Sequence, residues 1–531
     1  MRFKNIIAAA GILASTTFIN AQSVQPQAVN KEHAEKFSKI LVQDVQGRIK
    51  PMDSLSTDIL NKVSRKREID GLNYNQVVLG MMSAPQIWSQ VPLITVKHPD
   101  IKRILGIGKN QTHAKFSDFF DDSRKVPYKI NELVSTALRK PQAKRNNLDK
   151  EVLKIDELAN ICFMVFQGEL FRMFPVTGDP LNKWYSSVDV PAAASESERN
   201  EIKNLYKNYI VSVQSAYQNG NWELADEKLA AVSSYQKAKG GDLLKSDTEI
   251  GVEIFFNKVN IFDRISSIYM LSGLILLIMT FIEIVYNKAI LKIAHKIFVG
   301  IIGLSYAAHT FGLGLRWYIS GHAPWSNGYE SLIYIAWAMM GVGLFFGRNS
   351  ILALSTAAVM SGISLWVAHL SWMDPQVTNL VPVLKSYWLT IHVSVISASY
   401  GFFSLAALLG LVALILMIFR NEAKPKVDSA IKHVLRIDEM AMLVGIAFIA
   451  IGNLLGAVWA NESWGRYWSW DPKETWTFVS ISLYAAVLHL KYIPRVNTHY
   501  VFATASLWGF STILFTYFGV NYLISGLHSY L

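Results

Sequence analysis

The sequence predicts a mainly α-helical membrane protein, in which an exported soluble domain precedes a polytopic bundle of about eight transmembrane helices. Charged residues make up only 17% of the 531 residues, whereas soluble proteins average about 25%. The shortage is local, because residues 22–260 hold 33 of the 51 basic and 29 of the 40 acidic residues. Long apolar runs replace this composition from residue 264 onward, each of a length suited to a bilayer core of about 30 Å. The excess of basic residues therefore gives no reason to expect a nucleic-acid partner.

Residues 1–21 have the features of a secretory signal. Arg2 and Lys4 form a basic start before a short apolar run that ends at Ile19. The run is too short to cross a membrane comfortably, so it predicts either a cleaved signal peptide or a retained N-terminal anchor. Either way, the following domain is expected outside the cytoplasm.

Residues 22–260 are predicted to form a mixed, mainly helical extracytoplasmic domain. Residues 37–52 alternate around Gln46-Gly47 and predict a small hairpin. Residues 53–67 and 195–239 have helical spacing, the second interrupted at 219–221. This domain contains no nucleophile motif or phosphate loop, so the sequence assigns it no chemistry of its own.

The histidines and the single cysteine of this domain also have no predicted chemical role. His33, His98 and His113 lack metal-ligand spacing and are expected at the surface. Cys162 stands alone in an apolar stretch, which excludes a disulfide within the chain and a Cys-x-x-Cys redox motif. We expect Cys162 to be a small buried hydrophobic residue.

The membrane domain is predicted over residues 264–531. Its apolar runs are roughly 265–286, 297–315, 331–347, 351–370, 388–419, 438–460, 473–490 and 500–526. If residue 260 lies outside, the loops that face the cytoplasm hold eleven lysines and arginines and the opposite loops hold four. This asymmetry fits the positive-inside rule. It predicts a multi-pass protein of the cytoplasmic membrane, embedded in the lipid bilayer, with the C-terminus outside.

Residues 461–476, NESWGRYWSWDPKETW, are predicted to form an outward loop between the sixth and seventh runs. It holds four tryptophans, Trp464, Trp468, Trp470 and Trp476, and one tyrosine. One interpretation is an aromatic belt at the membrane surface, which usually takes one or two such residues per helix end. The density favours instead a platform for a flat apolar ligand, because aromatic faces offer a large area at low entropic cost.

The sequence of this loop resembles that of a known protein family. The pattern from Trp464 through Trp468, Trp470 and Asp471 to Glu474 resembles the tryptophan-rich WWD signature of haem-handling membrane proteins. The variant WGRYWSWDPKETW is similar to the CcsA branch (CcsBA-type, ResC-like) of system II cytochrome c biogenesis. The resemblance covers roughly residues 300–531. It implies that haem binds to Trp464, Trp468, Trp470 and Asp471 on the extracytoplasmic side.

Two histidines are expected on the same side as the Trp-rich loop. His392 lies about one turn inside the outer end of the fifth run, and His528 lies just past the outer end of the eighth. A lone membrane histidine is more often a polar residue with a satisfied hydrogen bond. Two imidazoles at matched depth can instead ligate one haem iron from opposite faces. The resemblance implies that His392 and His528 are the external ligands of the haem iron.

His489 is expected near the inner face, since eighteen residues of helix separate it from Asp471, or about 27 Å. The resemblance implies an inner histidine that receives haem on its way across the membrane. In fused family members the second inner ligand comes from a ResB-like part, which this sequence does not show. His499 is the only alternative considered within the chain. His295, His433 and His499 are otherwise expected in loops.

The loop Arg316–Leu332 also resembles the family and is expected to support the Trp-rich loop. Ser326 and Asn327 are expected to cap the next helix, and Glu330 to lie in its first turn. We expect His309 and His322 to be satisfied polar residues rather than ligands. We likewise expect Asp471 and Glu474 to orient the Trp-rich loop by capping the seventh run, and not to act as acid–base catalysts.

The resemblance implies a role in cytochrome c maturation. Haem b, as substrate and transient ligand, would move to the outer membrane face and be presented to the Cys-x-x-Cys-His motif of an apocytochrome c for thioether attachment. The chain would then be a cytochrome c synthase (haem lyase) component that acts with a ResB-like membrane subunit and a thiol-reducing partner for the apocytochrome. Alternatives are a haem exporter or chaperone without ligation activity, a bis-histidine electron-transfer cytochrome, and a structural assembly subunit.

Overall fold

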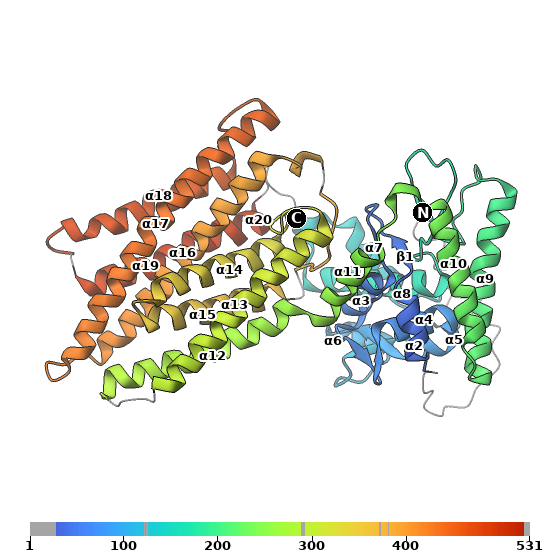
Figure 1. The fold of residues 1–531 in the computed structure, drawn as a ribbon, viewed down its shortest axis with the longest axis horizontal. Coiled ribbons are helices and arrows are strands. Elements are labelled where there is room, and N and C mark those ends of the chain that lie inside the picture. The colour runs from blue at the N-terminus through green and yellow to red at the C-terminus, as the bar shows by residue number, and fades with distance from the viewer. Residues whose placement is uncertain are drawn as a thin grey trace. The chain divides into compact units, whose positions relative to one another are not determined.

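The computed structural model describes residues 28–121, 123, 126–287, 292–370, 373–380, 382–496 and 498–524. The predicted signal segment 1–21 and His528 lie outside the described residues. The chain divides into two compact units, Met1–Lys258 and Val259–Leu531 (Figure 1).

Unit 1 is mainly helical, with four small antiparallel two-stranded sheets that pair β1 with β2, β3 with β4, β5 with β6, and β7 with β8. Its elements are α2 (Lys31–Phe37), β1 (Leu41–Gln43), β2 (Ile49–Pro51), α3 (Met52–Ser64), β3 (Glu68–Ile69), β4 (Leu72–Asn73), α4 (Tyr74–Ser83), α5 (Pro85–Trp88), β5 (Pro92–Thr95), α6 (Pro99–Leu105), β6 (His113–Lys115), η1 (Ser117–Phe119), α7 (Asn131–Arg139), η2 (Gln142–Lys144), α8 (Asn147–Gln167), β7 (Phe174–Pro175), β8 (Trp184–Tyr185), α9 (Glu196–Asn219), α10 (Glu223–Lys239), η3 (Gly241–Leu243) and α11 (Asp247–Val259).

The predicted hairpin and the predicted helical hairpin of unit 1 are both confirmed. β1 and β2 pair antiparallel, with Val42 opposite Lys50, and Gly47 takes the positive φ of +85° that closes the turn. Helices α9 and α10 are separated where Gly220 adopts a φ of +73° and ends α9.

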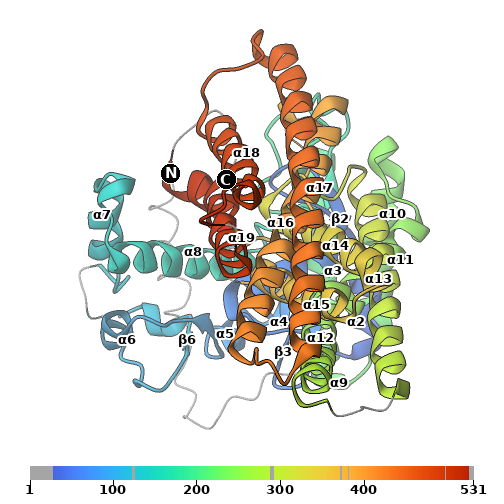
Figure 2. The same cartoon turned by 90° about the vertical axis from the view of Figure 1, so that its left-hand side faces the viewer.

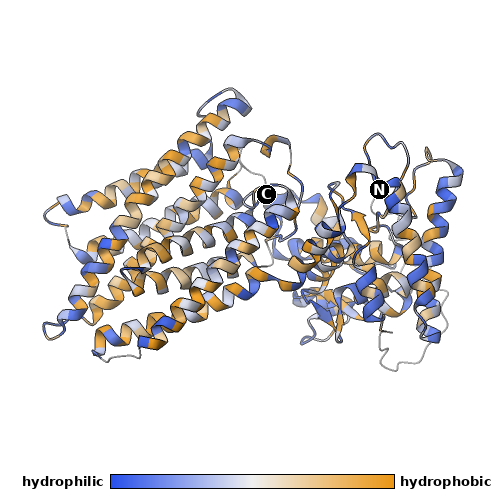
Figure 3. Cartoon of the chain, in the orientation of Figure 1, coloured by the Kyte–Doolittle hydropathy of each residue, from blue (hydrophilic) through white to orange (hydrophobic). Residues whose placement is uncertain are grey.

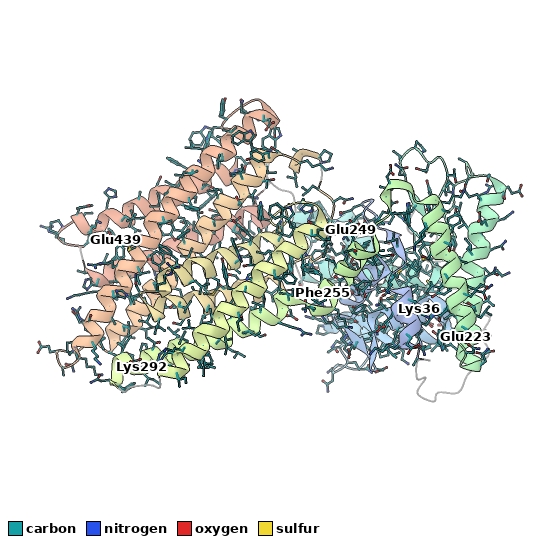
Figure 4. The ribbon with its side chains drawn as sticks, viewed as in Figure 1. Lys36, Glu223, Glu249, Phe255, Lys292 and Glu439 are labelled. Carbon is teal, nitrogen blue, oxygen red and sulfur yellow. The ribbon has the colours of Figure 1, made fainter. Side chains whose placement is uncertain are left out.

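The expectation that His33 lies at the surface is wrong. Its side chain is buried, and its two ring nitrogens contact Asp226 Oδ1 at 2.7 Å and the Tyr209 hydroxyl at 3.1 Å. Lys36 (labelled in Figure 4) also bonds to Asp226, and a pocket of about 450 Å³ opens beside these residues. The sequence spacing gave no sign of this network, because its members are about 190 residues apart.

Burial lowers the pKa of His33 below its ordinary value of 6.5, although the hydrogen bond and charge of Asp226 oppose this shift. Folded unit 1 therefore binds a proton at His33 less readily than the unfolded chain does. The contribution of neutral, buried His33 to the free energy of unfolding is fully present above pH 6.5. It is lost as the pH falls through the lowered pKa that His33 has in the folded state. Hydrogen exchange in α2 and α10 should accelerate over that range, and His33→Gln should remove this pH dependence.

Unit 2 is a bundle of long helices whose surfaces are largely apolar, as the colours of Figure 3 show. Its elements are α12 (Ile261–Tyr286), α13 (Lys292–Ser320), α14 (Gly328–Gly347), α15 (Ile351–Ala368), η4 (Pro382–Leu384), α16 (Tyr387–Ile418), α17 (Pro425–Trp464), α18 (Pro472–His489), η5 (Leu490–Tyr492), α19 (His499–Leu514), the π-helical turn η6 (Phe515–Gly519) and α20 (Val520–Leu523).

Eight long helices of unit 2 match the eight predicted apolar runs. Seven candidate spans within the described residues are long and apolar enough to cross a membrane, and α18 is not among them. The reason is that α18 begins with Pro472-Lys473-Glu474 and ends at His489, so it is not apolar enough along its length. The polytopic helical fold is confirmed.

Helix α17 is longer than the predicted run 438–460, because it begins at Pro425 and ends at Trp464. Residues 425–437 were expected in a loop. They continue the helix because Pro425 occupies its first turn, where no backbone donor is needed. Asp428 pairs there with Arg420 and with Lys432 one turn later.

Helices α16, α17 and α19 lie side by side in unit 2 (Figure 2). Glycines let α16 and α17 approach closely. A Cβ built on Gly452 of α17 would lie 2.7 Å from Ile396 Cγ1 of α16, and one built on Gly445 would lie 2.9 Å from the Phe403 ring. This packing determines the position of His392 on α16.

Candidate functional site

The Trp-rich loop is shorter than predicted. Trp464 is the last residue of α17, and Trp476 lies in the second turn of α18, so only residues 465–471 form the turn between the helices. Gly465 ends α17 with a φ of +71°, a conformation that glycine adopts without strain. Trp468 and Trp470 are therefore the two tryptophans carried by the turn itself.

The indole rings of this loop do not form one flat surface. The rings of Trp468 and Trp470 are 5.7 Å apart and nearly perpendicular, at 88°. Trp464 packs edge-on against the buried Trp459, with ring centres 4.8 Å apart. Trp470 is 72% exposed and Tyr467 is 61% exposed. A flat ligand that meets the face of Trp470 would thus meet the edge of Trp468, a geometry that aromatic groups favour.

Trp470 holds a strained backbone conformation. Its φ is +57°, in the left-handed region that costs a residue with a Cβ about 1–2 kcal/mol. Glu474 Oε2 accepts hydrogen bonds from the amides on both sides of Trp470, Ser469 N–H at 2.9 Å and Asp471 N–H at 3.3 Å. Glu474 therefore clamps the turn in the form that directs the Trp470 ring outward.

Asp471 caps α18, as the sequence predicts. It is buried, and its carboxylate accepts a hydrogen bond from the backbone N–H of Lys473 at 3.0 Å. Together with Glu474 it forms a capping box that begins the helix at Pro472. This arrangement gives Asp471 a role in holding the loop.

Replacing Glu474 with alanine should release the turn. The hydrogen bonds from the Ser469 and Asp471 amides to Glu474 are lost, each worth about 0.5–1.5 kcal/mol. Hydrogen exchange at these two amides should therefore accelerate by about tenfold. Glu462→Ala, which removes an exposed carboxylate of α17, is the matched control and should leave both amides unchanged. Equal exchange rates in wild type and Glu474→Ala would refute the clamp.

His392 is oriented by its contact with α17. Its Nδ1 lies 2.7 Å from the backbone carbonyl oxygen of Gly452, which can only accept a hydrogen bond. Nδ1 therefore carries the proton, and the neutral ring presents the lone pair of Nε2, the arrangement in which a histidine binds a metal. A Cβ on Gly456 would lie 2.6 Å from His392 Cε1, so this glycine makes room for the ring.

Gly452 and Gly456 are functional positions that the sequence analysis missed. They form a Gly-x-x-x-Gly pattern in an apolar helix, which favours close helix packing. Ile396 and His392 lie four residues apart on the facing side of α16 and pack on the two glycines. The pattern was visible in the sequence, but nothing in it indicated that the partner was the helix of His392.

Gly456→Ala should displace the His392 ring while α16 and α17 remain helical. Overpacking of this kind costs about 1–3 kcal/mol. Gly445→Ala, which crowds Phe403 instead, should cost similar stability without moving His392. Any haem spectrum that depends on His392 should change in the Gly456→Ala variant and stay as in wild type in Gly445→Ala. The same spectrum in both variants would show that Gly456 does not position the ring.

His489 is the last residue of α18, and its ring is exposed. Its Nδ1 contacts the Ala485 carbonyl oxygen at 2.7 Å, so Nε2 again bears the lone pair. The expectation that His295, His433 and His499 lie in loops is wrong, because they belong to α13, α17 and α19. His295 is also buried.

The loop between α13 and α14 is tied by a buried ion pair. Arg316 Nε bonds to Glu330 Oε1 at 2.9 Å, and both side chains are fully buried. The other guanidinium nitrogens donate to the carbonyl oxygens of Pro375 and Gln376, at 3.0 and 3.1 Å. This network connects the loop after α13 to the loop after α15. The sequence analysis placed Glu330 in the first turn of α14 but missed its partner.

The same loop is tied to the helix that carries His392. Trp325 Nε1 donates to the Thr390 carbonyl oxygen at 3.0 Å, two residues before His392. His322 Nε2 contacts the Thr378 carbonyl oxygen at 3.0 Å, and His309 Nε2 contacts the Ile333 carbonyl oxygen at 3.1 Å. His322 and His309 thus have hydrogen-bond partners, as predicted. Asn327 caps α14, as predicted. That this loop supports the Trp-rich loop stays a prediction.

Within the described part of the chain, no group of three or more His, Cys, Asp or Glu residues is placed to hold a metal ion. An axial pair of histidines is enough for a haem iron. Of the two histidines predicted to bind the iron, His392 has a defined position, and His528 lies beyond the described residues.

Comparison with known proteins identifies unit 2. The family model described as "Cytochrome C assembly protein" matches residues 325–528. The chain is 41% identical over 523 residues to protein NrfI of Wolinella succinogenes, which covers 98% of this chain and 57% of NrfI. The chain therefore spans a little over half the length of that relative, and unit 1 is included in the similarity.

Cytochrome c biogenesis proteins CcsA are matched over most of their length. That of Guillardia theta is 34% identical over 301 residues, 52% of this chain and 99% of the relative. That of Prochlorococcus marinus strain AS9601 is 36% identical over 257 residues, 42% of this chain and 80% of the relative. The chain belongs to the CcsA family of cytochrome c biogenesis proteins.

Proposed function

We propose that this chain presents haem at the outer membrane face for covalent attachment to an apocytochrome c. The observation that carries the proposal is that His392 and Trp470 are each held in an orientation suited to a flat, iron-containing ligand. His392 Nδ1 donates to the Gly452 carbonyl oxygen, so the lone pair is on Nε2, the nitrogen that would bind the iron. Trp470 is held outward by a clamped turn. Family membership supplies the biological setting.

The roles of the residues follow from this arrangement. His392 and His528 would bind the iron from opposite faces, and Trp470, with Trp468 and Trp464, would bind the porphyrin. Asp471 and Glu474 would hold the loop. The chain would thus contribute binding and orientation, while the haem supplies the reactive vinyl groups. Each substrate thiol adds across one vinyl group to form a thioether, with no net oxidation. The histidine of the Cys-x-x-Cys-His motif then replaces a histidine of this chain.

The inner end of the pathway is assigned to His489. Its exposed ring would meet haem before the outer site does, and its second ligand would come from a ResB-like membrane subunit. The proposed ligand is haem b, and the proposed substrate protein is an apocytochrome c kept reduced by a thiol-reducing partner. The proposed location is the cytoplasmic membrane, with unit 1, the Trp-rich loop and the C-terminus outside.

The second candidate function is export or chaperoning of haem without bond formation. It is supported by the same geometry, because a site made by His392 and the outward Trp470 can hold haem without any reaction at the vinyl groups. Under this alternative the same outer site holds haem, and another protein completes the attachment.

Co-expression separates the two functions. The chain is produced with a ResB-like subunit and an exported apocytochrome that carries one Cys-x-x-Cys-His motif. Haem that stays on the apocytochrome after denaturation, and that depends on this chain, supports the synthase function. A chain that purifies with haem but yields no covalent product supports the exporter. A chain that purifies without haem and gives no product contradicts both.

A further inference from the structure

Three polar side chains meet inside unit 2, away from the Trp-rich loop. Asp438 of α17, Tyr484 of α18 and Ser506 of α19 are each completely buried. Ser506 Oγ donates to Asp438 Oδ1 at 2.8 Å. Within the described residues, Asp438 Oδ2 and the Tyr484 hydroxyl have no hydrogen-bond partner. Buried polar atoms without partners are rare, and each requires a physical explanation.

The two unpartnered atoms belong to side chains that pack against one face of α19. Ser506 and Gly509 are three residues apart on α19, so they occupy neighbouring points of one face, about 5–6 Å apart. Ser506 bonds to Asp438, and a Cβ on Gly509 would lie 3.4 Å from the Tyr484 ring. The Asp438 carboxyl group and the Tyr484 phenol therefore face one shared region of the interior.

Close packing by α16 seals this region. The Phe403 ring stacks on the Tyr484 ring with centres 4.0 Å apart. Gly410 lies against α19, where a Cβ would come within 2.8 Å of the Ala503 carbonyl oxygen and 3.4 Å of Ser506 Cβ. The contacts from α16 are thus made by the apolar residues Phe403 and Gly410.

An ionised carboxylate does not fit these surroundings. Within the described residues, no basic nitrogen lies within 4.0 Å of the Asp438 carboxyl group. The neighbouring acid, Glu439 (labelled in Figure 4), is half-exposed and paired with Lys491. A buried, unpaired carboxylate costs several kcal/mol, and such a group takes up a proton instead. Once protonated, Asp438 has an O–H donor that needs an acceptor.

We propose that Asp438, Tyr484 and Ser506 form a buried proton-holding site, in which one water molecule connects the protonated Asp438 to the Tyr484 hydroxyl. A water needs two or more polar partners, and Asp438 and Tyr484 each supply one unpartnered atom on this face of α19. The site belongs to the end of α18 that carries His489, five residues or about 7.5 Å further along the helix.

Infrared spectroscopy of the full chain in lipid nanodiscs, compared between light and heavy water, tests the site. Wild type should show the carbonyl band of a protonated carboxylic acid, shifted in heavy water. Asp438→Asn should abolish the band, and Tyr484→Phe should shift it. Glu439→Gln, which changes the adjacent but salt-bridged acid, should leave it unchanged.

Two results would overturn the proposal. One is that the spectrum of Asp438→Asn keeps the band of wild type, so that the band does not come from Asp438. The same holds if sodium ions abolish the wild-type band, since the site would then hold a carboxylate with a metal cation. The other is failure of Asp438→Asn to fold, because asparagine matches the shape and neutrality of protonated aspartate. The melting temperature of this variant should stay within a few degrees of wild type, on the order of a 1 kcal/mol effect.

Discussion

His392→Ala should abolish formation of covalent cytochrome c by this chain and its partners. The ring is positioned by the Gly452 carbonyl oxygen and by the absence of a side chain at Gly456, and alanine at position 392 offers no nitrogen to the iron. Loss of an outer-shell partner of a metal ligand already costs about 10–100-fold, so loss of the ligand itself should cost at least about 100-fold. The measurement is haem that remains bound to denatured cytochrome c.

Two controls make this result specific. His433→Ala changes an exposed histidine of α17 that bonds to the Asn349 carbonyl oxygen, and it should leave the yield unchanged. Free imidazole should partly restore activity to the His392→Ala variant, because it can occupy the vacated position. Full activity of His392→Ala without added imidazole would exclude His392 as a required ligand.

Breaking the Arg316–Glu330 ion pair should cause the largest loss of stability among these variants. Arg316→Met leaves the Glu330 carboxylate buried, and although it still accepts the Ser326 N–H, its charge is no longer compensated. Such losses cost about 3–5 kcal/mol. The measurement is thermal unfolding of helices in unit 2, followed in detergent.

The double variant Arg316→Met/Glu330→Met distinguishes the charge from the shape of the pair. Replacing a whole buried pair by apolar side chains is often close to neutral, so the double variant should be more stable than Arg316→Met alone. If the single variant unfolds like wild type, the network does not hold the two loops.

Much of the fold could be predicted from composition and periodicity. The eight apolar runs correspond to α12–α19, and the break at Gly220 separates α9 from α10, because segment length and glycine placement are local properties. The start and end of α17 were missed by thirteen and four residues. Charged residues extend that helix beyond the apolar stretch, and hydropathy does not detect them.

The site was predictable in its residue types but not in its arrangement. The sequence indicated that His392, Trp468 and Trp470 were special, and Asp471 and Glu474 were expected to cap α18. The positive φ of Trp470 and the tautomer of His392 depend on contacts with Glu474 and Gly452 that only the folded chain forms. Pairs distant in sequence, such as Arg316 with Pro375 and His33 with Asp226, follow from tertiary packing and have no local signal.

The most direct test of the outer haem site is the absorption spectrum of the purified, haem-loaded chain. Wild type should show six-coordinate haem with two histidine ligands. His392→Ala and His528→Ala should each lose this signature, while Glu462→Ala should keep it. If both histidine variants retain unchanged bis-histidine haem, the two imidazoles do not hold the iron and the proposed outer site is wrong.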